Sequence, residues 1–373
     1  MRGWDRYTTG LVRALVDLGV EVSLLHRDAH PLHPTHVADL DCEVVGLPDR
    51  GGLWWEQVTV PRTLRARGFD LYHAPAEHGV PLHATRPRVL TIHSATVHSY
   101  VDLVRRGVLQ GPVQAYLGKD AKGGWSATGL YWRLQVRAAD HILTPSRFCR
   151  AEVVNLLGVP EDHVTATPLA VHRQFLRQPS PPSVRERVLE ELGVRSPYLL
   201  YVGGYEPHKN VPGVLRVFAT VQQQRPDLTI VLVGSKSVPG DLPACAQSLG
   251  LSEGDDVVFL LDLGTRLTDL YDGAAAFLTL SWRESFCLPA LEAMTRGLPV
   301  VCSSWGAGPE VAGDAGMLMD PRDEGAAAAA VLHVLSTERR NELRDRVRQR
   351  AAMFSWTKTA QQTLRVYNRL VGK

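Results

Sequence analysis

Short apolar runs alternate with helical stretches along the second half of the chain. Five runs rich in β-branched residues are apolar on both faces; they lie at 198–204, 228–235, 257–261, 275–281 and 298–304. Strands of this kind are typical of parallel sheets that helices cover on both sides, and their alternation with helices indicates βα units. This half of the sequence therefore predicts a doubly wound α/β domain.

The first half of the chain repeats this alternation less regularly. Its strand candidates lie at 20–26, 42–47, 69–74, 88–93 and 140–145. Between the halves, residues 178–183 (QPSPPS) have the composition of an interdomain linker. We therefore expect an α/β protein of two Rossmann-like domains, 1–177 and 184–355, which face each other across a cleft at the carboxyl ends of their sheets, where such folds bind ligands.

The chain enters on a helix. Residues 5–19 already show a helical period, and no strand stands ahead of them to seed the first βα unit. In a doubly wound sheet the first strand is central, and a sheet without it would expose two unpaired edges. We therefore expect either that the natural protein begins about 15 residues upstream, with a strand and a glycine-rich loop, or that the sheet has closed up without that strand.

Composition and charge narrow the class of protein. The 373 residues are 45% hydrophobic and 21% charged, which suits a soluble protein with two domains. The formal net charge of +2 provides no broad basic field, so nucleic acid is not an expected partner. Five scattered cysteines without a C-x-x-C pair, and the lack of a signal peptide or a long apolar run, predict a cytoplasmic protein; peripheral membrane contact stays open.

A segment with a carboxylate at each end, ESFCLPALE at 284–292, follows the strand candidate 275–281. Pro289 stands where the first turn of a helix favours proline. Glu284 should therefore lie in the loop between strand and helix, and Glu292 about one turn inside the helix.

The N-terminus of this helix predicts a phosphate site, because its unpaired amides carry roughly half a unit of positive charge. Three amides should point out of it: those of Phe286, Cys287 and Leu288. A carboxylate that touched the phosphate would repel it. The two flanking glutamates make better sense as acceptors for sugar hydroxyls on either side of a diphosphate, one for a hexose and one for a ribose.

Five motifs occur in an order that resembles a known family. They are VLTIHS (89–94), RAADHILTPSRF (137–148), LYVGGYEPHKN (200–210), the E-x7-E segment followed by AMTRGLPVV and PEV (309–311), and a closing helix that contains SW. Together they resemble the retaining glycosyltransferases of family 4 over nearly the whole chain. The resemblance implies the GT-B fold, with the helix 356–373 crossing back to complete the N-terminal domain.

The resemblance implies a role for each matching side chain. Glu284 would bind hydroxyls of the donor sugar, Glu292 would bind the ribose of the nucleotide, and His93 would hold the sugar near its anomeric carbon. Lys209 would neutralise the diphosphate and, with Glu284 and His93, completes the expected catalytic set.

The resemblance also implies how the diphosphate is held without a metal ion. The amides at 286–288 and those of Gly203 and Gly204 would assist Lys209, so neither a metal nor another cofactor is expected. The implied reaction transfers a hexosyl unit with retention from a nucleotide sugar, UDP- or GDP-linked, to a glycan, lipid-linked or small-molecule acceptor. The nucleotide base, sugar, acceptor, linkage and oligomeric state stay open.

Two positions depart from the family pattern. Many members carry an arginine where this chain has Gly204, and His208 or Arg283 are the candidates to replace that cation. Cys287 stands where glycine is commoner, which is tolerable if the backbone avoids positive φ. Two alternatives stay open: a nucleotide-sugar epimerase of the same fold, or a catalytically silent GT-B binding subunit, which Gly204 and the missing first strand make plausible.

Plainer interpretations stand beside these roles. The glutamates could be solvated residues of a helix face, Lys209 a surface lysine at a turn, and His93 a hydrogen-bonded core residue. The histidines of 26–36 suggest a metal site, but Pro31 and Pro34 break any helix that could align them. The basic and aromatic residues of 100–132 suit an acceptor-side lid, a membrane-surface patch or a solvated loop equally well.

Overall fold

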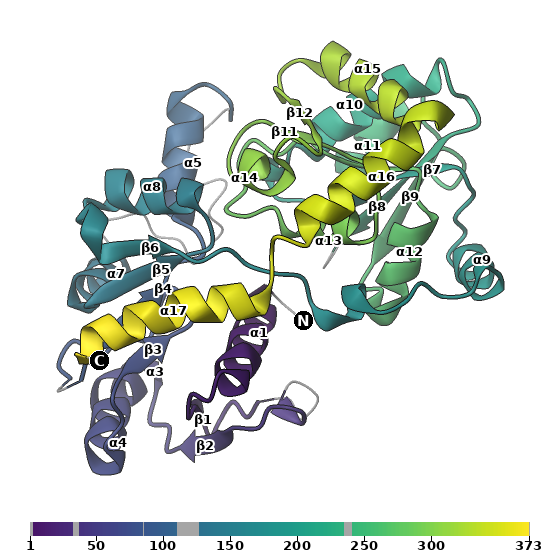
Figure 1. Ribbon diagram of the computed structural model, residues 1–373. Coiled ribbons are helices and arrows are strands. Elements are labelled where there is room, and N and C mark those ends of the chain that lie inside the picture. Colours follow the sequence, from purple (N-terminus) through teal and green to yellow (C-terminus); the bar gives the residue numbers. More distant parts are fainter. Residues whose placement is uncertain (1–2, 33–36, 85, 110–126, 235–240, 373) are drawn as a thin grey trace. The chain divides into compact units, whose positions relative to one another are not determined.

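The computed structural model describes residues 3–32, 37–84, 86–109, 127–234 and 241–372 (Figure 1). The chain divides into two compact units. The first comprises Met1–Asp102, Pro112–Ala170 and Ser355–Lys373, and the second comprises Leu103–Gly111 and Val171–Phe354. Each unit is of the α/β class, with parallel strands and flanking helices.

The described part of the second unit is built on six parallel strands. They are β7 (Tyr198–Val202), β8 (Thr229–Gly234), β9 (Val257–Leu261), β10 (Ala276–Thr279), β11 (Val300–Ser303) and β12 (Met317–Met319). Their order is β12-β11-β10-β7-β8-β9, the doubly wound order of a Rossmann-like domain. The direction of winding reverses between β7 and β10, where this fold binds its ligands. Five of these strands were predicted, and β12 was not.

Helices and short turns connect these strands. They are η3 (Arg173–Leu176), α9 (Pro182–Glu191), η4 (Pro207–Lys209), α10 (Val211–Gln222), α11 (Asp241–Ser248), η5 (Gly264–Arg266), α12 (Leu267–Gly273), α13 (Leu288–Thr295), α14 (Gly308–Ala312), α15 (Glu324–Leu335) and α16 (Thr337–Ala351). Helix α10 shows why they form: Val214, Val217, Phe218 and Val221 recur at helical spacing and are all buried. They pack with strand residues in one large core.

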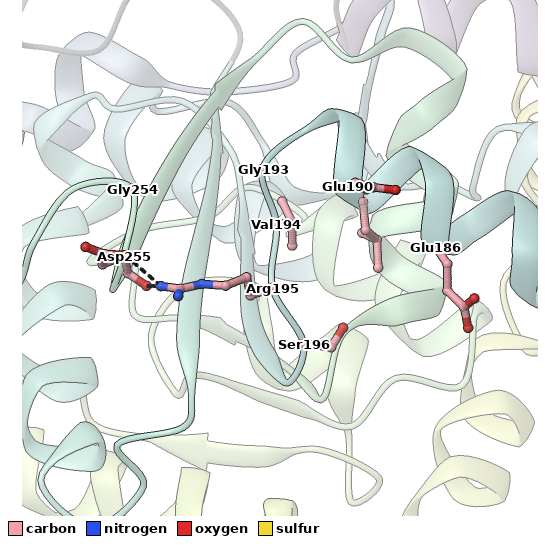
Figure 2. A pocket seen from close by; sticks show the side chains of 9 residues that line it. Glu186, Glu190, Gly193, Val194, Arg195, Ser196, Gly254 and Asp255 are labelled. Atoms are coloured by element: carbon pink, nitrogen blue, oxygen red, sulfur yellow. Dashed lines mark hydrogen bonds and ion pairs between the residues drawn. The ribbon is translucent and has the colours of Figure 1, made fainter.

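A shallow hollow of about 550 Å³ opens at the amino ends of β7 and β9 (Figure 2). Glu186 and Glu190 of α9 line it on one side, and the exposed ion pair between Arg195 and Asp255 closes another, with 3.0 Å between Arg195 Nη2 and Asp255 Oδ1. Ligands of doubly wound folds bind at the opposite, carboxyl ends of the strands. The hollow is therefore not where the chemistry of this fold is expected.

The described strands of the first unit form two separate sheets. Strands β1 (Ser23–Arg27) and β2 (Glu43–Leu47) pair with each other. The second sheet has the order β3-β4-β5-β6, with β3 (Tyr72–Ala74), β4 (Arg88–Thr91), β5 (His141–Thr144) and β6 (Val164–Ala166). Within the described residues β1 does not pair with β3, so the expectation that the sheet has closed up is wrong. In the second unit β7 is the first strand of the sheet and lies at its centre. None of the described strands of the first unit takes the corresponding place.

The first and last helices pack against each other in the first unit. Helix α1 (Gly3–Asp17) packs against α17 (Trp356–Val371), which it meets near the start of α17 in Figure 1, and the two share an apolar cluster around Tyr7 and Ala360. Gly10 of α1 lies so close to Trp356 that a methyl group in its place would collide with the indole ring. The close approach therefore requires glycine at this position.

Other helices and turns of the described chain flank the two sheets of the first unit. They are α3 (Gly52–Trp54), η1 (Trp55–Thr59), α4 (Val60–Arg67), α5 (Thr96–Arg105), α7 (Ala127–Ala138), α8 (Arg147–Leu157) and η2 (Glu161–His163). Helix α8 shows why these elements begin and end at their particular residues. The Ser146 side chain accepts a hydrogen bond from the amide of Cys149 at its start, and Gly158 with a left-handed backbone ends it.

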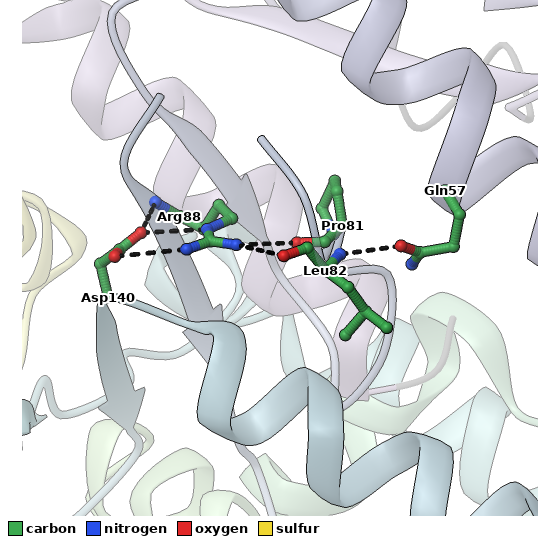
Figure 3. A network of polar contacts seen from close by, with 5 residues as sticks. All are labelled: Gln57, Pro81, Leu82, Arg88 and Asp140. Carbon is green, nitrogen blue, oxygen red and sulfur yellow. Dashed lines mark hydrogen bonds and ion pairs between the residues drawn. The ribbon is translucent and has the colours of Figure 1, made fainter. Parts of the chain in front are cut away.

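A polar network fixes the loop that precedes β4 (Figure 3). The guanidinium of Arg88 donates hydrogen bonds to the carboxylate of Asp140 and to the carbonyls of Pro81 and Leu82. The amide of Leu82 in turn donates to Gln57 Oε1 at 2.8 Å. Because Arg88 begins β4 and Asp140 precedes β5, this network stabilises the amino ends of the strands, away from their carboxyl ends.

No helix in the described ranges is both long and apolar enough to cross a membrane.

Candidate functional site

Two loops meet at the point of the second sheet where the winding reverses. One follows β7 and contains Gly203, Gly204 and Lys209; the other follows β10 and contains Glu284. The amide of Trp282 donates to the carbonyl of His208 at 2.8 Å. The side chain of Asn210, whose backbone is left-handed, donates to the carbonyl of Leu280 at 3.0 Å. These hydrogen bonds hold the two loops side by side.

The structure brings Lys209 and Glu284 into direct contact. Lys209 Nζ lies 2.8 Å from Glu284 Oε1 and 2.9 Å from Oε2. The Ser281 hydroxyl donates to Oε1 at 2.8 Å. The side chains of Lys209 and Glu284 are only 18% and 13% exposed. The pair is therefore largely desolvated, which rules out a solvated helix face for Glu284 and an exposed turn for Lys209.

Each member of this pair keeps the other charged. Burial alone would lower the pKa of Lys209, but the charge and hydrogen bonds of Glu284 outweigh it and leave that pKa raised. Burial would likewise raise the pKa of Glu284, and the charge of Lys209 reverses the shift, so that this pKa lies below its ordinary value. The two pKa shifts have the same consequence: Lys209 is an ammonium and Glu284 is a carboxylate.

The neighbouring cation candidates differ in charge. Burial, and then the charge of Lys209, lower the pKa of His208 to about 3, so this imidazole is neutral at physiological pH. Arg283 is 7% exposed and always charged. Of the two candidates for the cation expected at Gly204, Arg283 is therefore the one that carries charge.

Close packing explains the glycines of the loop after β7. A Cβ at Gly203 would lie 2.9 Å from the hydroxyl of Tyr201, which donates to the carbonyl of Gly204. A Cβ at Gly204 would collide with the carboxylate of Glu206. The position of the family's arginine is thus covered here by a carboxylate, a feature that sequence reasoning missed.

Helix α13 begins directly beside the pair, as predicted. Its N-cap is Cys287, whose φ of 67° is left-handed. A cysteine was expected to be tolerated here if the backbone avoided positive φ. The backbone does not avoid it. A left-handed backbone costs a non-glycine residue roughly 1–2 kcal/mol. The side chains of Phe286 and Cys287 are buried, so only their backbone can serve a ligand.

We expect Cys287→Gly to be more stable than Cys287→Ala by about 1 kcal/mol. Both variants lose the thiol, but only alanine keeps the Cβ that strains a left-handed backbone. The usual order, in which alanine stabilises more than glycine, should thus be reversed. Urea denaturation of the two variants measures the difference, and a more stable alanine variant would show that position 287 carries no such strain.

Glu292 lies one turn inside α13, where it was predicted. It is 1% exposed, and the Tyr271 hydroxyl donates to its Oε2 at 2.9 Å. Tyr271 itself is buried between Phe175 and Phe277. Sequence reasoning missed this tyrosine because it lies on α12, far from the motif.

A third loop, after β11, contacts the loop that carries Glu284. The amide of Ala307 donates to the carbonyl of Glu284 at 2.9 Å. A Cβ at Gly306 would lie 2.6 Å from the amide nitrogen of Glu284. The rings of Trp305 and Trp282 meet edge to face, with centroids 5.7 Å apart. These contacts fix the backbone of Glu284, and the sequence offered only the PEV motif as their signal.

His93 lies in the first unit, directly after β4. Its Nε2 is 2.9 Å from the carbonyl of Pro75, which can only accept, so Nε2 carries the proton and Nδ1 is an acceptor. Burial lowers the pKa of His93 against the opposing effects of Glu77 and the Pro75 carbonyl. The edge of the Tyr7 ring packs at 4.7 Å between centroids. His93 is thus a neutral histidine with a fixed orientation.

A second half-buried histidine, which sequence reasoning missed, supports this region. His73 Nε2 lies 2.7 Å from Thr91 Oγ1, and Nδ1 contacts the Tyr367 hydroxyl of α17. The Tyr7 hydroxyl lies 2.9 Å from the same Thr91 oxygen. Burial lowers the pKa of His73 to about 3, so it is neutral. This network joins α1, β3, β4 and α17.

The described residues contain no group of three or more histidine, cysteine, aspartate or glutamate side chains that could hold a metal ion. His33 and His36 of the histidine-rich stretch lie outside the described ranges. So do Tyr116, Lys119, Lys122 and Trp125 of the basic and aromatic segment.

Comparison with known proteins gives the same family over both units. A model of Glycosyltransferase Family 4 matches residues 1–175, and a model of Glycosyl transferases group 1 matches residues 185–353. The chain is 31% identical to D-inositol 3-phosphate glycosyltransferase 2 of Catenulispora acidiphila, over 99% of this chain and 85% of that protein. It is 34% identical to O-antigen chain mannosyltransferase B of Escherichia coli, over 62% of this chain and 61% of that protein.

Solved structures share the fold. Anabaena HepE in complex with UDP-glucose matches with a TM-score of 0.73 and 17% identity, over 99% of this chain and 97% of that one. WaaG, a glycosyltransferase involved in lipopolysaccharide biosynthesis, matches with a TM-score of 0.68 and 16% identity, over 100% and 96%. The GT-B fold predicted from the sequence is thereby confirmed.

Proposed function

The chain belongs to glycosyltransferase family 4, and from that premise we propose that it transfers a hexosyl unit from a nucleotide-diphosphate sugar to an acceptor hydroxyl with retention of configuration. The observation that carries the proposal is the desolvated pair of Lys209 and Glu284 beside the N-terminus of α13. A cation for phosphate and an acceptor for sugar hydroxyls stand next to each other at the point where a doubly wound sheet binds its ligand.

The diphosphate is proposed to bind Lys209, the amides at 286–288 and that of Gly204. The amide of Gly203, also expected to bind phosphate, instead donates to the carbonyl of Val233 at 3.0 Å. The ammonium and the helix N-terminus both favour negative charge. They stabilise the leaving diphosphate as the glycosidic bond breaks, the stage at which charge develops. This set of donors requires no divalent cation.

The hexose is proposed to bind through its hydroxyls, which donate to Glu284. His93 is proposed as a further ligand of the sugar near the anomeric carbon, with Nδ1 as acceptor and no charge. Retention then follows if the leaving phosphate takes the proton of the acceptor hydroxyl on the face from which the diphosphate departs. In that reaction no protein carboxylate needs to act as a general base.

The donor class rests on the relatives. HepE was crystallised with UDP-glucose, and the Escherichia coli relative is named as a mannosyltransferase. UDP- and GDP-linked hexoses are therefore the first donors to test. The acceptor is proposed as a hydroxyl of a glycan, a lipid-linked glycan or a small molecule.

Incubation with radiolabelled UDP-glucose, UDP-N-acetylglucosamine and GDP-mannose tests this function. We expect the label of one donor to move to an acceptor, or to water in its absence, at the same rate with EDTA as with magnesium. A thermal-shift panel of the same nucleotides should identify that donor, because a ligand that binds only the folded protein raises its apparent stability. Activity lost in EDTA and restored by magnesium would refute the metal-free site.

Binding without transfer or hydrolysis would favour the silent subunit. Interconversion of two free nucleotide sugars would favour the epimerase.

A further inference from the structure

We infer that Glu284 competes with the donor diphosphate for Lys209, so that the site favours an intact nucleotide sugar over a nucleoside diphosphate. The inference rests on the proposed function, since it concerns the same donor site. Lys209 and Glu284 would then do more than bind phosphate and sugar separately. As a pair, they would also help to select the donor and to release the product.

The geometry of the pair carries the argument. Both carboxylate oxygens of Glu284 lie within 2.9 Å of Lys209 Nζ. Two of the three N–H groups of the ammonium are thus used by Glu284. A diphosphate that took the third would place a second anion beside the first, in a site where both side chains are at most 18% exposed. Binding of phosphate therefore requires Glu284 to give up at least part of its contact with Lys209.

Among the described residues the glycine loop itself supplies only Lys209 as a charged cation, and Arg283, 7% exposed and next to Glu284 in the chain, is a further cation of the site. Gly204 has no side chain, and the carboxylate of Glu206 covers its Cα. His208 is neutral.

Separation of the pair leaves Glu284 short of donors. Ser281 still donates to Oε1 at 2.8 Å, but a desolvated carboxylate accepts several hydrogen bonds and loses free energy when they are missing. The hydroxyls of a bound hexose supply them. A nucleoside diphosphate has no hexose, so it separates the pair without compensation.

Hydrogen bonds hold the backbone on both sides of the pair, so that only the side chains of Lys209 and Glu284 can change partners when the donor binds. Lys209 ends η4 directly before Asn210, which is tied to Leu280. Glu284 is tied to Ala307. Since both backbones are held, the side chains alone must exchange partners. After transfer the product lacks the hexose, Glu284 returns to Lys209, and the nucleoside diphosphate is released.

The test is titration calorimetry of the full chain with UDP, GDP, UDP-glucose and GDP-mannose. In Glu284→Gln, which keeps the shape of the side chain but not its charge, the preferred nucleoside diphosphate should bind about ten- to a hundredfold more tightly than in the wild type. The preference of the wild type for the sugar-linked form should largely disappear, because glutamine does not hold Lys209.

Glu206→Gln is the matched control. It removes the same charge from the same loop. Glu206 is exposed, and its hydrogen bond with Lys209 joins the two backbones, from the Lys209 amide to the Glu206 carbonyl at 2.8 Å. The charge of Glu206 raises the pKa of Lys209 less than that of Glu284 does. The effect of Glu206→Gln on nucleoside diphosphate affinity should stay within about threefold, as expected of a charge screened by salt. An equal gain in both variants would mean that net charge alone is responsible, and would overturn the inference.

Unchanged or weaker binding of nucleoside diphosphate by Glu284→Gln also overturns the inference, while the proposed function survives. A wild-type protein that binds none of the four nucleotides overturns both.

Carbon-13 NMR of lysine-labelled protein tests the pair without any nucleotide, and only six lysines are present. The Lys209 signal should titrate above the ordinary lysine pKa in the wild type and at a lower pH in Glu284→Gln. An ordinary pKa in the wild type would show that the pair does not form.

Discussion

Replacement of Lys209 by methionine is expected to lower the rate of sugar transfer by about 10²- to 10³-fold, the loss typical when one preorganised group that stabilises a developing charge is removed. Methionine keeps the length of the side chain but offers no positive charge to the leaving diphosphate. Steady-state transfer from the preferred radiolabelled donor measures the effect, and kcat should fall more than KM rises.

The loss of charge must be separated from a loss of structure, because Lys209→Met leaves Glu284 as a desolvated carboxylate without its ammonium. The double variant Lys209→Met/Glu284→Gln removes both charges and should recover thermal stability without recovering transfer. Lys358→Met, at an exposed position of α17, should behave as the wild type. Transfer within tenfold of the wild type in a folded Lys209→Met protein would remove Lys209 from the catalytic set.

Replacement of Glu292 by alanine is expected to weaken binding of the nucleoside diphosphate by about ten- to a hundredfold, which corresponds to a charge-assisted hydrogen bond to a ribose hydroxyl. Calorimetry with UDP and GDP measures it. Glu292 is 1% exposed and accepts from Tyr271, so a purely structural role is the competing explanation.

Tyr271→Phe distinguishes the two roles of Glu292. It removes the hydroxyl that donates to Oε2 but keeps the carboxylate and the packing against Phe175 and Phe277. If Glu292 binds ribose, Tyr271→Phe should lower thermal stability and leave nucleotide affinity within a few-fold of the wild type. An equal loss of affinity in both variants would argue that Glu292 acts only by holding the fold together.

The strands that the sequence predicted correctly are those with a strong local signal. Strands β7, β8, β10 and β11 are apolar and almost wholly buried, as burial on both faces of a sheet requires. Strand β9 is equally apolar, although it lies at the sheet edge and is partly exposed. Strands β6 and β12 have only three residues each and are partly exposed, so the sequence contains no apolar run long enough to predict them. Of the two alternatives for the first sheet, the closed one was wrong, because pairing of β1 with β3 is a tertiary contact that the residue pattern of neither strand determines.

The site was predictable as a set of loops but not as a set of contacts. Spacing placed Glu284 and Lys209 after strands that meet in any doubly wound sheet. That their side chains would pair depends on rotamers and on the tie between Asn210 and Leu280, which no pattern encodes. The left-handed backbone of Cys287 and the position of Glu206 next to Gly204 could not be predicted either. Both are local conformations, and a motif specifies only the types of its residues.

The packing of α1 against α17 bears on how the protein folds as it leaves the ribosome. Tyr7, Leu11 and Leu15 of α1 are synthesised well before the helix that helps to bury them, which follows some 340 residues later. At about 5–20 residues per second, this apolar face waits on the order of tens of seconds for its partner. The second unit, whose sheet comes from one continuous stretch of chain, can fold in that interval. Folding of the first unit is therefore completed only when α17 emerges, and until then the apolar face of α1 is a surface that a chaperone can bind.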